Sequence, residues 1–282
     1  MDLEGRSVVV SGGTSGIGRA TALRLASRGA EVIVIGRDAA KGAEVETALR
    51  AAASGKGSFL QADLSLLSDA RRVLRDLNGR LPRLDALIQS AGVIDFEATL
   101  TTEGLNKVFV TNFLQRFVLA EGLMPLLATA SGRMVMVAAD IPDKIEPDWA
   151  NFEGAKTYSG ITSLVRLHSA GLAFVQRFAD EWAAIGIEVT AIHPGQVDTG
   201  IYRSATGPWA VLKPFMSLFF VPVEKPAALL SWLAFSPEAK GLSGNLFPSV
   251  RRRSKHRKLK RSAQTLDRVF AVARATLAAH VE

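Results

Sequence analysis

The sequence predicts an α/β protein whose single domain is built on a doubly wound, mostly parallel sheet of about seven strands. Short runs rich in Val and Ile alternate with helical patterns along most of the 282 residues, an order typical of parallel sheets covered by helices on both faces. A glycine-rich turn follows the first of these runs directly. The chain is 48% hydrophobic, which is enough for one large core.

The first strand, at residues 8–10, leads into a turn at residues 11–18 and then into an apolar pattern with helical spacing. Glycines let the backbone approach a pyrophosphate, whose negative charge is favoured by free N–H groups and by the helix dipole. The alternative is a glycine-rich turn without a ligand, because short motifs produce false matches. The predicted phosphate-binding residues are Gly12, Thr14, Ser15, Gly16, Ile17 and Gly18.

The second strand, at residues 31–37, indicates which nucleotide is bound. A dinucleotide fold that holds a free ribose 2′-hydroxyl places an acid at the end of this strand. Here Gly36 and Arg37 stand in that place, and Lys41 follows one helical turn later. Because these cations favour a 2′-phosphate, the sequence predicts NADP(H) as the cofactor. The alternative is a solvated Arg37 at a strand end.

Further strand-and-turn units are predicted at residues 58–64 and 84–92, and two later strands at residues 133–138 and 187–193. Residues 244–247 suggest a seventh strand. Helical patterns alternate with these strands, and this alternation favours a Rossmann-type sheet.

Four segments resemble the nucleotide-binding motifs of one family: the turn at residues 11–18, Asp63-Leu64, Ala91-Gly92, and the loop from Pro194-Gly195 to Thr199. They are similar to the glycine motif, the adenine contact, the Asn-Asn-Ala-Gly turn and the nicotinamide-side loop of the short-chain dehydrogenase/reductases. The resemblance covers essentially the whole chain and is strongest to the retinol-dehydrogenase-like branch. It implies cofactor contacts from Asp63, Leu64, Ala91, Gly92, Pro194, Gly195 and Thr199.

The resemblance also implies a catalytic tetrad of Asn, Ser, Tyr and Lys, of which only Asn112 is present. Ala139 stands in the serine position at the end of the fifth strand. Leu164 and His168 stand in the positions of the Tyr-x-x-x-Lys motif. The spacing to Ala139 on one side, and to the strand that ends at His193 on the other, agrees with this alignment.

Three side chains remain as candidates for acid–base chemistry. His168 is expected near the nicotinamide ribose, and an unperturbed imidazole with a pKa of ~6.5 exchanges a proton near neutrality. The alternative is a neutral His168 bonded to a ribose hydroxyl or to helix backbone. Asp140 follows Ala139 and is either a base at the pocket mouth or a turn residue. Tyr158 is the remaining tyrosine nearby, but Thr162 stands where its lysine would be expected.

Two segments near the C-terminus differ in character from the rest. Residues 201–226 are apolar and aromatic and are predicted to form a substrate lid within a dinucleotide-binding domain of residues 1–250, which implies an apolar or polycyclic substrate. Core packing or a membrane-surface anchor is the alternative. Residues 251–282 contain a basic segment and a C-terminal helix that is expected to pack on the same domain, across the pocket mouth.

The net charge of +7 comes from the basic segment at residues 251–261, which holds eight of the 34 Lys and Arg. Nucleic acid is therefore not an expected partner. The segment is expected to contact anionic lipid, an acidic partner or a phosphorylated substrate, or to be a solvated linker. With no cysteine and four scattered histidines, no metal site is predicted. The acidic start leaves no room for a signal peptide, so a cytoplasmic protein is expected. The resemblance also implies a homodimer through the helices that carry Asn112 and His168.

Three functions fit these observations. The first is an atypical NADP(H)-dependent oxidoreductase that takes its proton from His168, from water or from the substrate. The second is a non-redox enzyme, such as a cyclase, isomerase or dehydratase of a natural-product pathway. The third is a pseudoenzyme that senses a ligand. The first is preferred because the glycine turn, Arg37, Asp63, Asn112 and Thr199 are all present.

Overall fold

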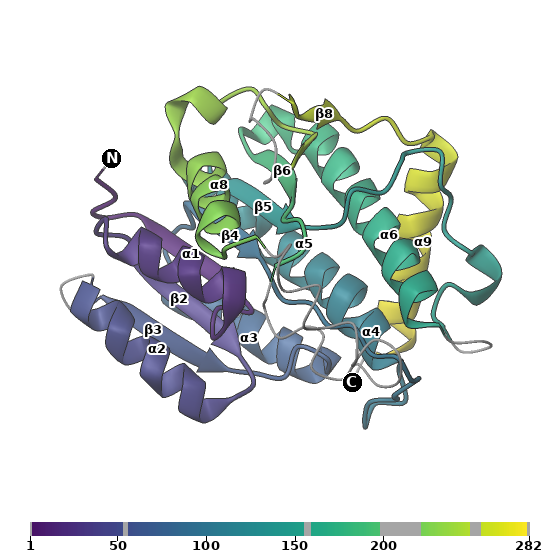
Figure 1. The fold of residues 1–282 in the computed structure, drawn as a ribbon, viewed down its shortest axis with the longest axis horizontal. Helices are drawn as coiled ribbons and strands as arrows, with labels where there is room; N and C mark the ends of the chain where they lie inside the picture. The colour runs from purple at the N-terminus through teal and green to yellow at the C-terminus, as the bar shows by residue number, and fades with distance from the viewer. Residues whose placement is uncertain (1, 53–55, 155–158, 198–220, 249–254, 281–282) are drawn as a thin grey trace.

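Eight strands form one sheet in the computed structural model of this chain, which describes residues 2–52, 56–154, 159–197, 221–248 and 255–280 (Figure 1). The strand order is β3-β2-β1-β4-β5-β6-β7-β8, and all neighbours are parallel except β7 and β8. The strands are β1 (Ser7–Ser11), β2 (Glu31–Gly36), β3 (Gly57–Gln61), β4 (Ala86–Gln89), β5 (Arg133–Val137), β6 (Glu188–His193), β7 (Asn245–Pro248) and β8 (Arg257–Lys258). The doubly wound parallel sheet predicted from the sequence is confirmed.

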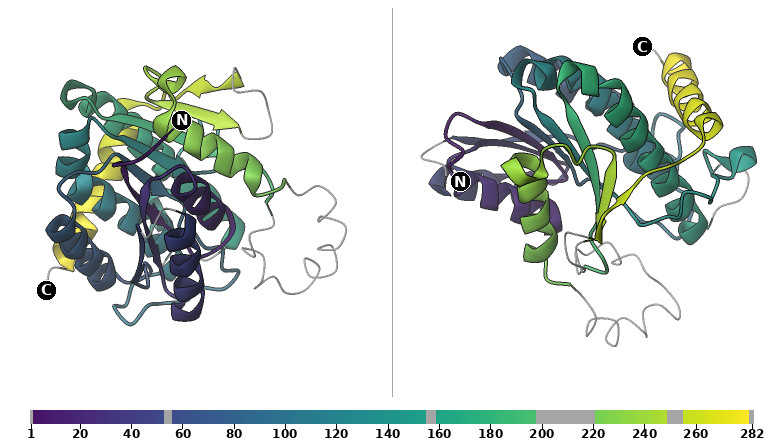
Figure 2. Two further views of the ribbon diagram at one scale, coloured as in Figure 1. Left: turned by 90° about the vertical axis from the view of Figure 1, so that its left-hand side faces the viewer. Right: turned by 90° about the horizontal axis from the view of Figure 1, so that it is seen from above.

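The strands are apolar on both faces because helices cover both sides of the sheet (Figure 2). One face is covered by α1, α2 and α8, and the other by α3, α5 and α6, with α9 outside α6. The helices are α1 (Gly16–Ala26), α2 (Ala39–Ala52), α3 (Leu67–Arg80), α4 (Lys107–Phe109), α5 (Gln115–Ala130), α6 (Gly160–Glu181), α8 (Glu224–Phe235) and α9 (Ala263–Ala279).

The order in which strands are added to the sheet reverses between β1 and β4, although these two strands are parallel. From β1 the chain builds outward to β2 and β3, and it then returns to the other side of β1 to build β4, β5 and β6. Ligands of open parallel sheets bind at such a reversal, beyond the carboxyl ends of the strands. The fold therefore places a binding crevice above β1 and β4.

Helix α5 is the central helix of one face. Together with α4 it belongs to an apolar stretch, Lys107–Ala130, that has the length and composition of a membrane span among the described residues, although half of its most apolar window is buried inside the molecule. Phe117 on α5 packs against Phe174 and Phe178 of α6 and against Phe270 of α9. These contacts explain the hydropathy of α5 by core packing.

The position of α9 differs from the sequence prediction, which placed this helix across the pocket mouth. Its buried residues Val269, Phe270 and Ala273 pack on the side of α6 that faces away from the sheet. Arg177 of α6 pairs with Asp267 at 2.6 Å and lies over the Phe270 ring. Helix α9 therefore covers the aromatic surface of α5 and α6.

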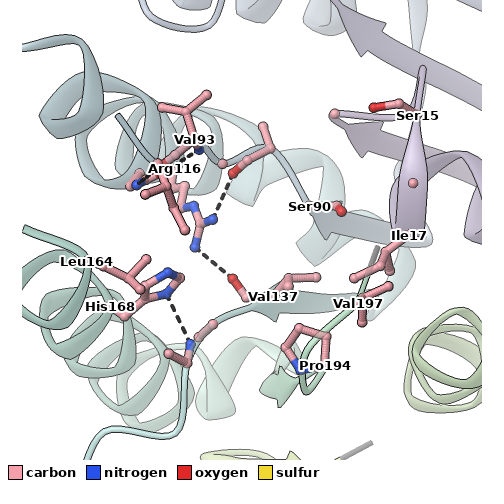
Figure 3. A pocket seen from close by; sticks show the side chains of 18 of the residues that line it. Ser15, Ile17, Ser90, Val93, Arg116, Val137, Leu164, His168, Pro194 and Val197 are labelled. Atoms are coloured by element: carbon pink, nitrogen blue, oxygen red, sulfur yellow. Dashed lines mark hydrogen bonds between the residues drawn. The ribbon is translucent and has the colours of Figure 1, made fainter. Parts of the chain in front are cut away.

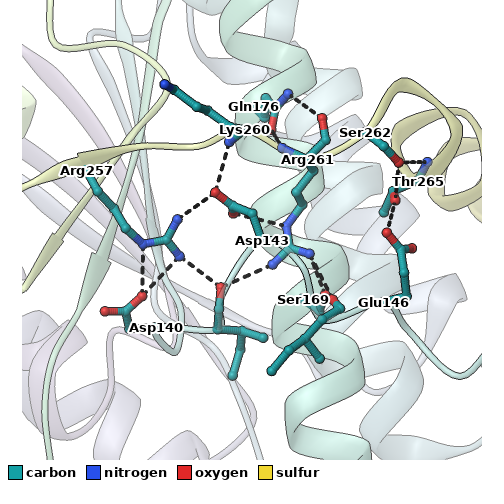
Figure 4. A network of polar contacts seen from close by, with 12 residues as sticks. Asp140, Asp143, Glu146, Ser169, Gln176, Arg257, Lys260, Arg261, Ser262 and Thr265 are labelled. Atoms are coloured by element: carbon teal, nitrogen blue, oxygen red, sulfur yellow. Dashed lines mark hydrogen bonds and ion pairs between the residues drawn. The ribbon is translucent and has the colours of Figure 1, made fainter.

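The basic segment is a second difference, because its described part is bound within the molecule (Figure 4). Arg257 lies in β8 and pairs with Asp143 at 2.9 Å and with Asp140 at 3.0 Å. Arg261 is completely buried: it donates to Ser169 Oγ at 2.8 Å and lies 3.8 Å from Asp143. Burial lowers the pKa of Arg261, and the charge of Asp143 opposes that shift. These cations attach β8 and α9 to the loop after β5.

We predict that Asp143→Ala destabilises the protein far more than Asp140→Ala. Asp143 is the carboxylate beside a fully buried guanidinium, and breaking a buried pair from one side costs about 3 kcal/mol or more. The Asp140 side chain is 46% exposed, and exposed pairs contribute below ~1 kcal/mol. Urea unfolding of both variants measures the difference. Equal losses of stability in the two variants would show that Asp143 does not compensate the buried charge of Arg261.

Candidate functional site

A cavity of about 630 Å³ opens at the reversal of strand order (Figure 3). It is lined by the turn after β1, the end of β2, the turns after β4 and β5, the start of α6 and the loop after β6. The predicted cofactor-binding residues that line it are Gly12, Thr14, Ser15, Gly16, Ile17, Arg37, Ala91, Gly92, His168, Pro194 and Gly195.

The remaining predicted cofactor residues lie elsewhere. Gly18 does not line the cavity; a Cβ on this residue would lie 2.3 Å from the Gly12 oxygen, so its role is close packing of the turn. Asp63 does not line the cavity either, and its carboxylate accepts from the Ser65 amide at 3.0 Å. Its neighbour Leu64 is a buried core residue. Thr199 lies outside the described residues.

The turn after β1 has the geometry of an anion site. Gly12 has a φ of +70°, and a Cβ here would lie 2.8 Å from the backbone of Ala91. Helix α1 begins at Gly16, its N-cap Ser15 makes no side-chain cap, and its first turn holds no acid. The N–H groups at this helix end therefore face the cavity without a protein anion, and a pyrophosphate fits there.

The end of β2 holds both cations and one acid that the sequence analysis did not weigh. Gly36 has no room for a Cβ, which would lie 2.6 Å from Thr14 Cγ2. Arg37, Asp38 and Lys41 all line the cavity. Asp38 accepts a hydrogen bond from the Lys41 backbone amide at 3.1 Å and pairs with Lys41 Nζ at 3.1 Å. The hydrogen bond from the backbone amide is the first cause of the lowered pKa of Asp38. The Asp38 charge is thus directed toward the first turn of α2.

Asn112 lies in a π-helical turn, Val110–Leu114, between α4 and α5. Its Oδ1 accepts from the Val93 amide at 2.9 Å, and its Nδ2 donates to the Val93 carbonyl at 2.7 Å. The side chain of Gln115 donates to the Thr111 carbonyl at 2.8 Å within the same turn. Asn112 therefore fixes the loop after β4 at the cavity wall, and π-turns of this kind are frequent at functional sites.

The three positions aligned with Ser, Tyr and Lys come together, since Ala139, Leu164 and His168 all line the cavity. His168 Nδ1 accepts from the Ala139 N–H at 3.0 Å. Burial, followed by the charge of Arg116, lowers the pKa of His168 to about 3. This geometry and the lowered pKa favour the neutral, backbone-bonded histidine named as the alternative over a His168 that exchanges a proton near neutrality.

Of the other two acid–base candidates, only Asp140 lies among the described residues. Asp140 is absent from the cavity lining, and its carboxylate is held by the Arg257 guanidinium at 3.0 Å. Its neighbour Ile141 accepts from the same guanidinium at 2.8 Å, which gives this turn a structural role. Tyr158 lies outside the described residues, as does most of the predicted lid at 201–226. Val197, on the cavity wall, forms a parallel bridge with Val221. The Val221 amide donates to the Gln196 carbonyl.

Arg116 is the site residue that the sequence analysis missed. It lines the cavity, is 2% exposed and donates to the carbonyls of Ala91 at 2.7 Å and Val137 at 2.9 Å. A signal for it exists, because Arg116 is the one charged residue between Lys107 and Glu121 and lies four positions after Asn112. Residues four apart share a helix face.

A glycine turn beneath a helix N-terminus, at the reversal of a parallel sheet, defines a dinucleotide-binding protein of the Rossmann type. The short chain dehydrogenase family model matches residues 6–207, and the chain belongs to this family.

Individual relatives agree with this assignment. Retinol dehydrogenase 14 of Mus musculus is 31% identical over 261 residues, which cover 87% of this chain and 78% of the relative. Polyprenol dehydrogenase of Mus musculus is 32% identical over 249 residues, which cover 85% and 74%. The solved Pseudomonas aeruginosa RhlG/NADP active-site complex is 27% identical with a TM-score of 0.68, covering 88% of this chain and 95% of that one.

We predict that the His168 ring does not titrate between about pH 5 and pH 8, as followed by NMR of the ring. The unfolded chain takes up a proton near pH 6.5 and the folded one near pH 3. The contribution of His168 to the free energy of unfolding is therefore fully present above pH 6.5. It is lost as the pH falls toward 3, by up to ~1.4 kcal/mol per pH unit. His168→Asn keeps an acceptor for Ala139 and should lack this loss. A ring midpoint near 6.5 would contradict the prediction.

Proposed function

We propose that this protein is an atypical NADP(H)-dependent oxidoreductase that acts on an apolar small molecule without a Ser-Tyr-Lys set. One observation carries the proposal: a single cavity joins the phosphate turn, Arg37 and Lys41 to the positions occupied by Ala139, Leu164 and His168. The nucleotide half has the phosphate turn and the cations at the end of β2, while the catalytic half has different chemistry.

The choice of NADP(H) over NAD(H) rests on charge. Arg37 and Lys41 stand at the end of β2, where the adenosine ribose lies in this fold. Asp38 is engaged by Lys41, which leaves Arg37 as the exposed cation for a 2′-phosphate. The NADP complex among the structural relatives supports the same choice. When bound, the reduced cofactor supplies a hydride to an acceptor carbon.

The residues of the chain then position and polarise the substrate. His168 does not serve as the proton source. His168 stays neutral, and its Nδ1 is occupied by Ala139, so the ring offers only the N–H at Nε2. Asn112 holds the loop after β4, and Leu164 presents an apolar side chain where the family has tyrosine. The proton that completes a reduction is then supplied by water or by the substrate.

An apolar substrate is supported by the relatives, since two of them are named for retinol and polyprenol, both apolar alcohols. A second candidate function, a non-redox enzyme or ligand sensor on the same scaffold, is favoured by the replacement of all three catalytic side chains at once. Binding of NADPH together with oxidation of the bound cofactor by apolar carbonyl compounds separates the first candidate from the second.

We predict that Arg37→Leu weakens NADPH binding by roughly 10- to 100-fold, the effect of deleting a hydrogen bond between charged groups, and leaves NADH binding unchanged. Fluorescence titration of the reduced nicotinamide measures both constants. Arg50→Leu is the matched control, because Arg50 is exposed on α2 and paired with Glu46. Equal affinity of wild type for NADPH and NADH would refute the role of Arg37.

A further inference from the structure

Arg116 is a buried cation that the mechanism above does not use. It projects from the first turn of α5 into the floor of the cavity, between the ends of β4 and β5 (Figure 3). Two of its five N–H groups donate to the carbonyls of Ala91 and Val137, which fixes the plane of the guanidinium. Its Nε is fully buried and has no hydrogen-bond partner among the described residues.

This cation has no counter-ion in the described part of the chain. The carboxylate of Asp95, which lines the same cavity, is held by Lys107 at 2.9 Å. No described carboxylate lies within ion-pair distance of Arg116. Removing a charge from water costs several kcal/mol, and proteins normally compensate such a cost with a partner. An uncompensated guanidinium in a cavity therefore indicates a ligand that brings the anion.

His168 adds a second donor beside this cation. Figure 3 shows its ring next to the Arg116 guanidinium, and the charge of Arg116 contributes to the lowered pKa of His168. With Nδ1 accepting from Ala139, the neutral ring carries its proton on Nε2. No described residue accepts from Nε2. These two groups have only donors left to offer and cannot satisfy each other, so a bound acceptor oxygen is the complementary partner for both.

We propose that Arg116 and His168 form an oxyanion subsite, which holds an anionic oxygen of the substrate at the reacting end of the cavity. The substrate class is then an apolar molecule that carries a carboxylate or an enolate. This proposal rests on the proposed function, since it specifies the substrate end of the same cavity. The donor pair stabilises negative charge by preorganised hydrogen bonds, as in other oxyanion sites.

Benzoate and benzamide test the proposal, because they have the same shape and differ in charge. Calorimetric titration of the wild-type protein without nucleotide should show benzoate binding at least tenfold tighter than benzamide, the effect of one hydrogen bond to a charged group. The titration is repeated with saturating NADP⁺. Retained benzoate binding assigns the subsite to the substrate. Its loss would overturn the proposal and assign the donors to the nucleotide.

Three variants locate the binding. Arg116→Met should weaken benzoate at least tenfold, and Arg116→Lys, which keeps the charge but loses the planar fork, should weaken it less. His168→Asn keeps the bond to Ala139, removes the Nε2 donor and should also weaken benzoate. Arg274→Met is the control, since Arg274 is an exposed cation on α9 outside the cavity. Unchanged benzoate binding in folded Arg116→Lys and His168→Asn would refute the subsite.

The pH dependence needs no variant. Burial lowers the pKa of Arg116 to about 10, so benzoate binding should fall as the pH rises through about 10. The titratable groups facing Arg116 are His168 on α6 and His193 on β6, with the Asp95–Lys107 pair farther along the cavity wall. Binding that persists undiminished well above this pH would contradict the lowered pKa of Arg116. Failure of NADPH to bind would refute the proposed function separately, because the first benzoate titration uses no nucleotide.

Discussion

The close approach of two backbone turns, one after β1 and one after β4, determines the geometry of the whole site. Gly12 lies against Ala91 so tightly that a single added carbon would be 2.8 Å from the neighbouring backbone. The Ser90 amide donates to the Ser11 carbonyl at 3.1 Å and holds the two turns together. This contact joins the phosphate turn after β1 to the part of the cavity beside β4 that is lined by Ala91, Arg116 and His168, which we call the catalytic floor. The nucleotide and substrate ends thus share one cavity.

The charges of the catalytic floor differ from those that the family tetrad implies. At the position that the resemblance assigns to a lysine, α6 carries the neutral His168, and the cation of this region is Arg116 on α5. A guanidinium bonded to two strand ends is far less mobile than a lysine on its flexible stem. The positive charge therefore lies in the floor of the cavity, and its orientation is determined by the sheet itself.

The strands and the phosphate turn were predictable from the sequence because parallel strands buried on both faces are continuous apolar runs. The family resemblance implies the alignment of Ala139, Leu164 and His168, and all three residues line the cavity. The protonation of His168 was not predictable, since it depends on the burial of the ring and on the Ala139 N–H after β5, both of which exist only in the folded chain. β8 was missed for a similar reason: a run of Arg and Lys pairs with the sheet only where Asp140 and Asp143 receive its charges.

The bridge between Val197 and Val221 has a consequence for the evolution of substrate range. The chain leaves the cavity wall at Val197 and returns beside it at Val221, whose amide donates to the Gln196 carbonyl at 2.7 Å. Closing a longer loop between anchored ends costs only ~0.6 kcal/mol for each doubling of its length. Insertions and exchanges between these two valines can therefore accumulate while the phosphate turn keeps its shape, so that binding of new molecules can evolve on an unchanged nucleotide site.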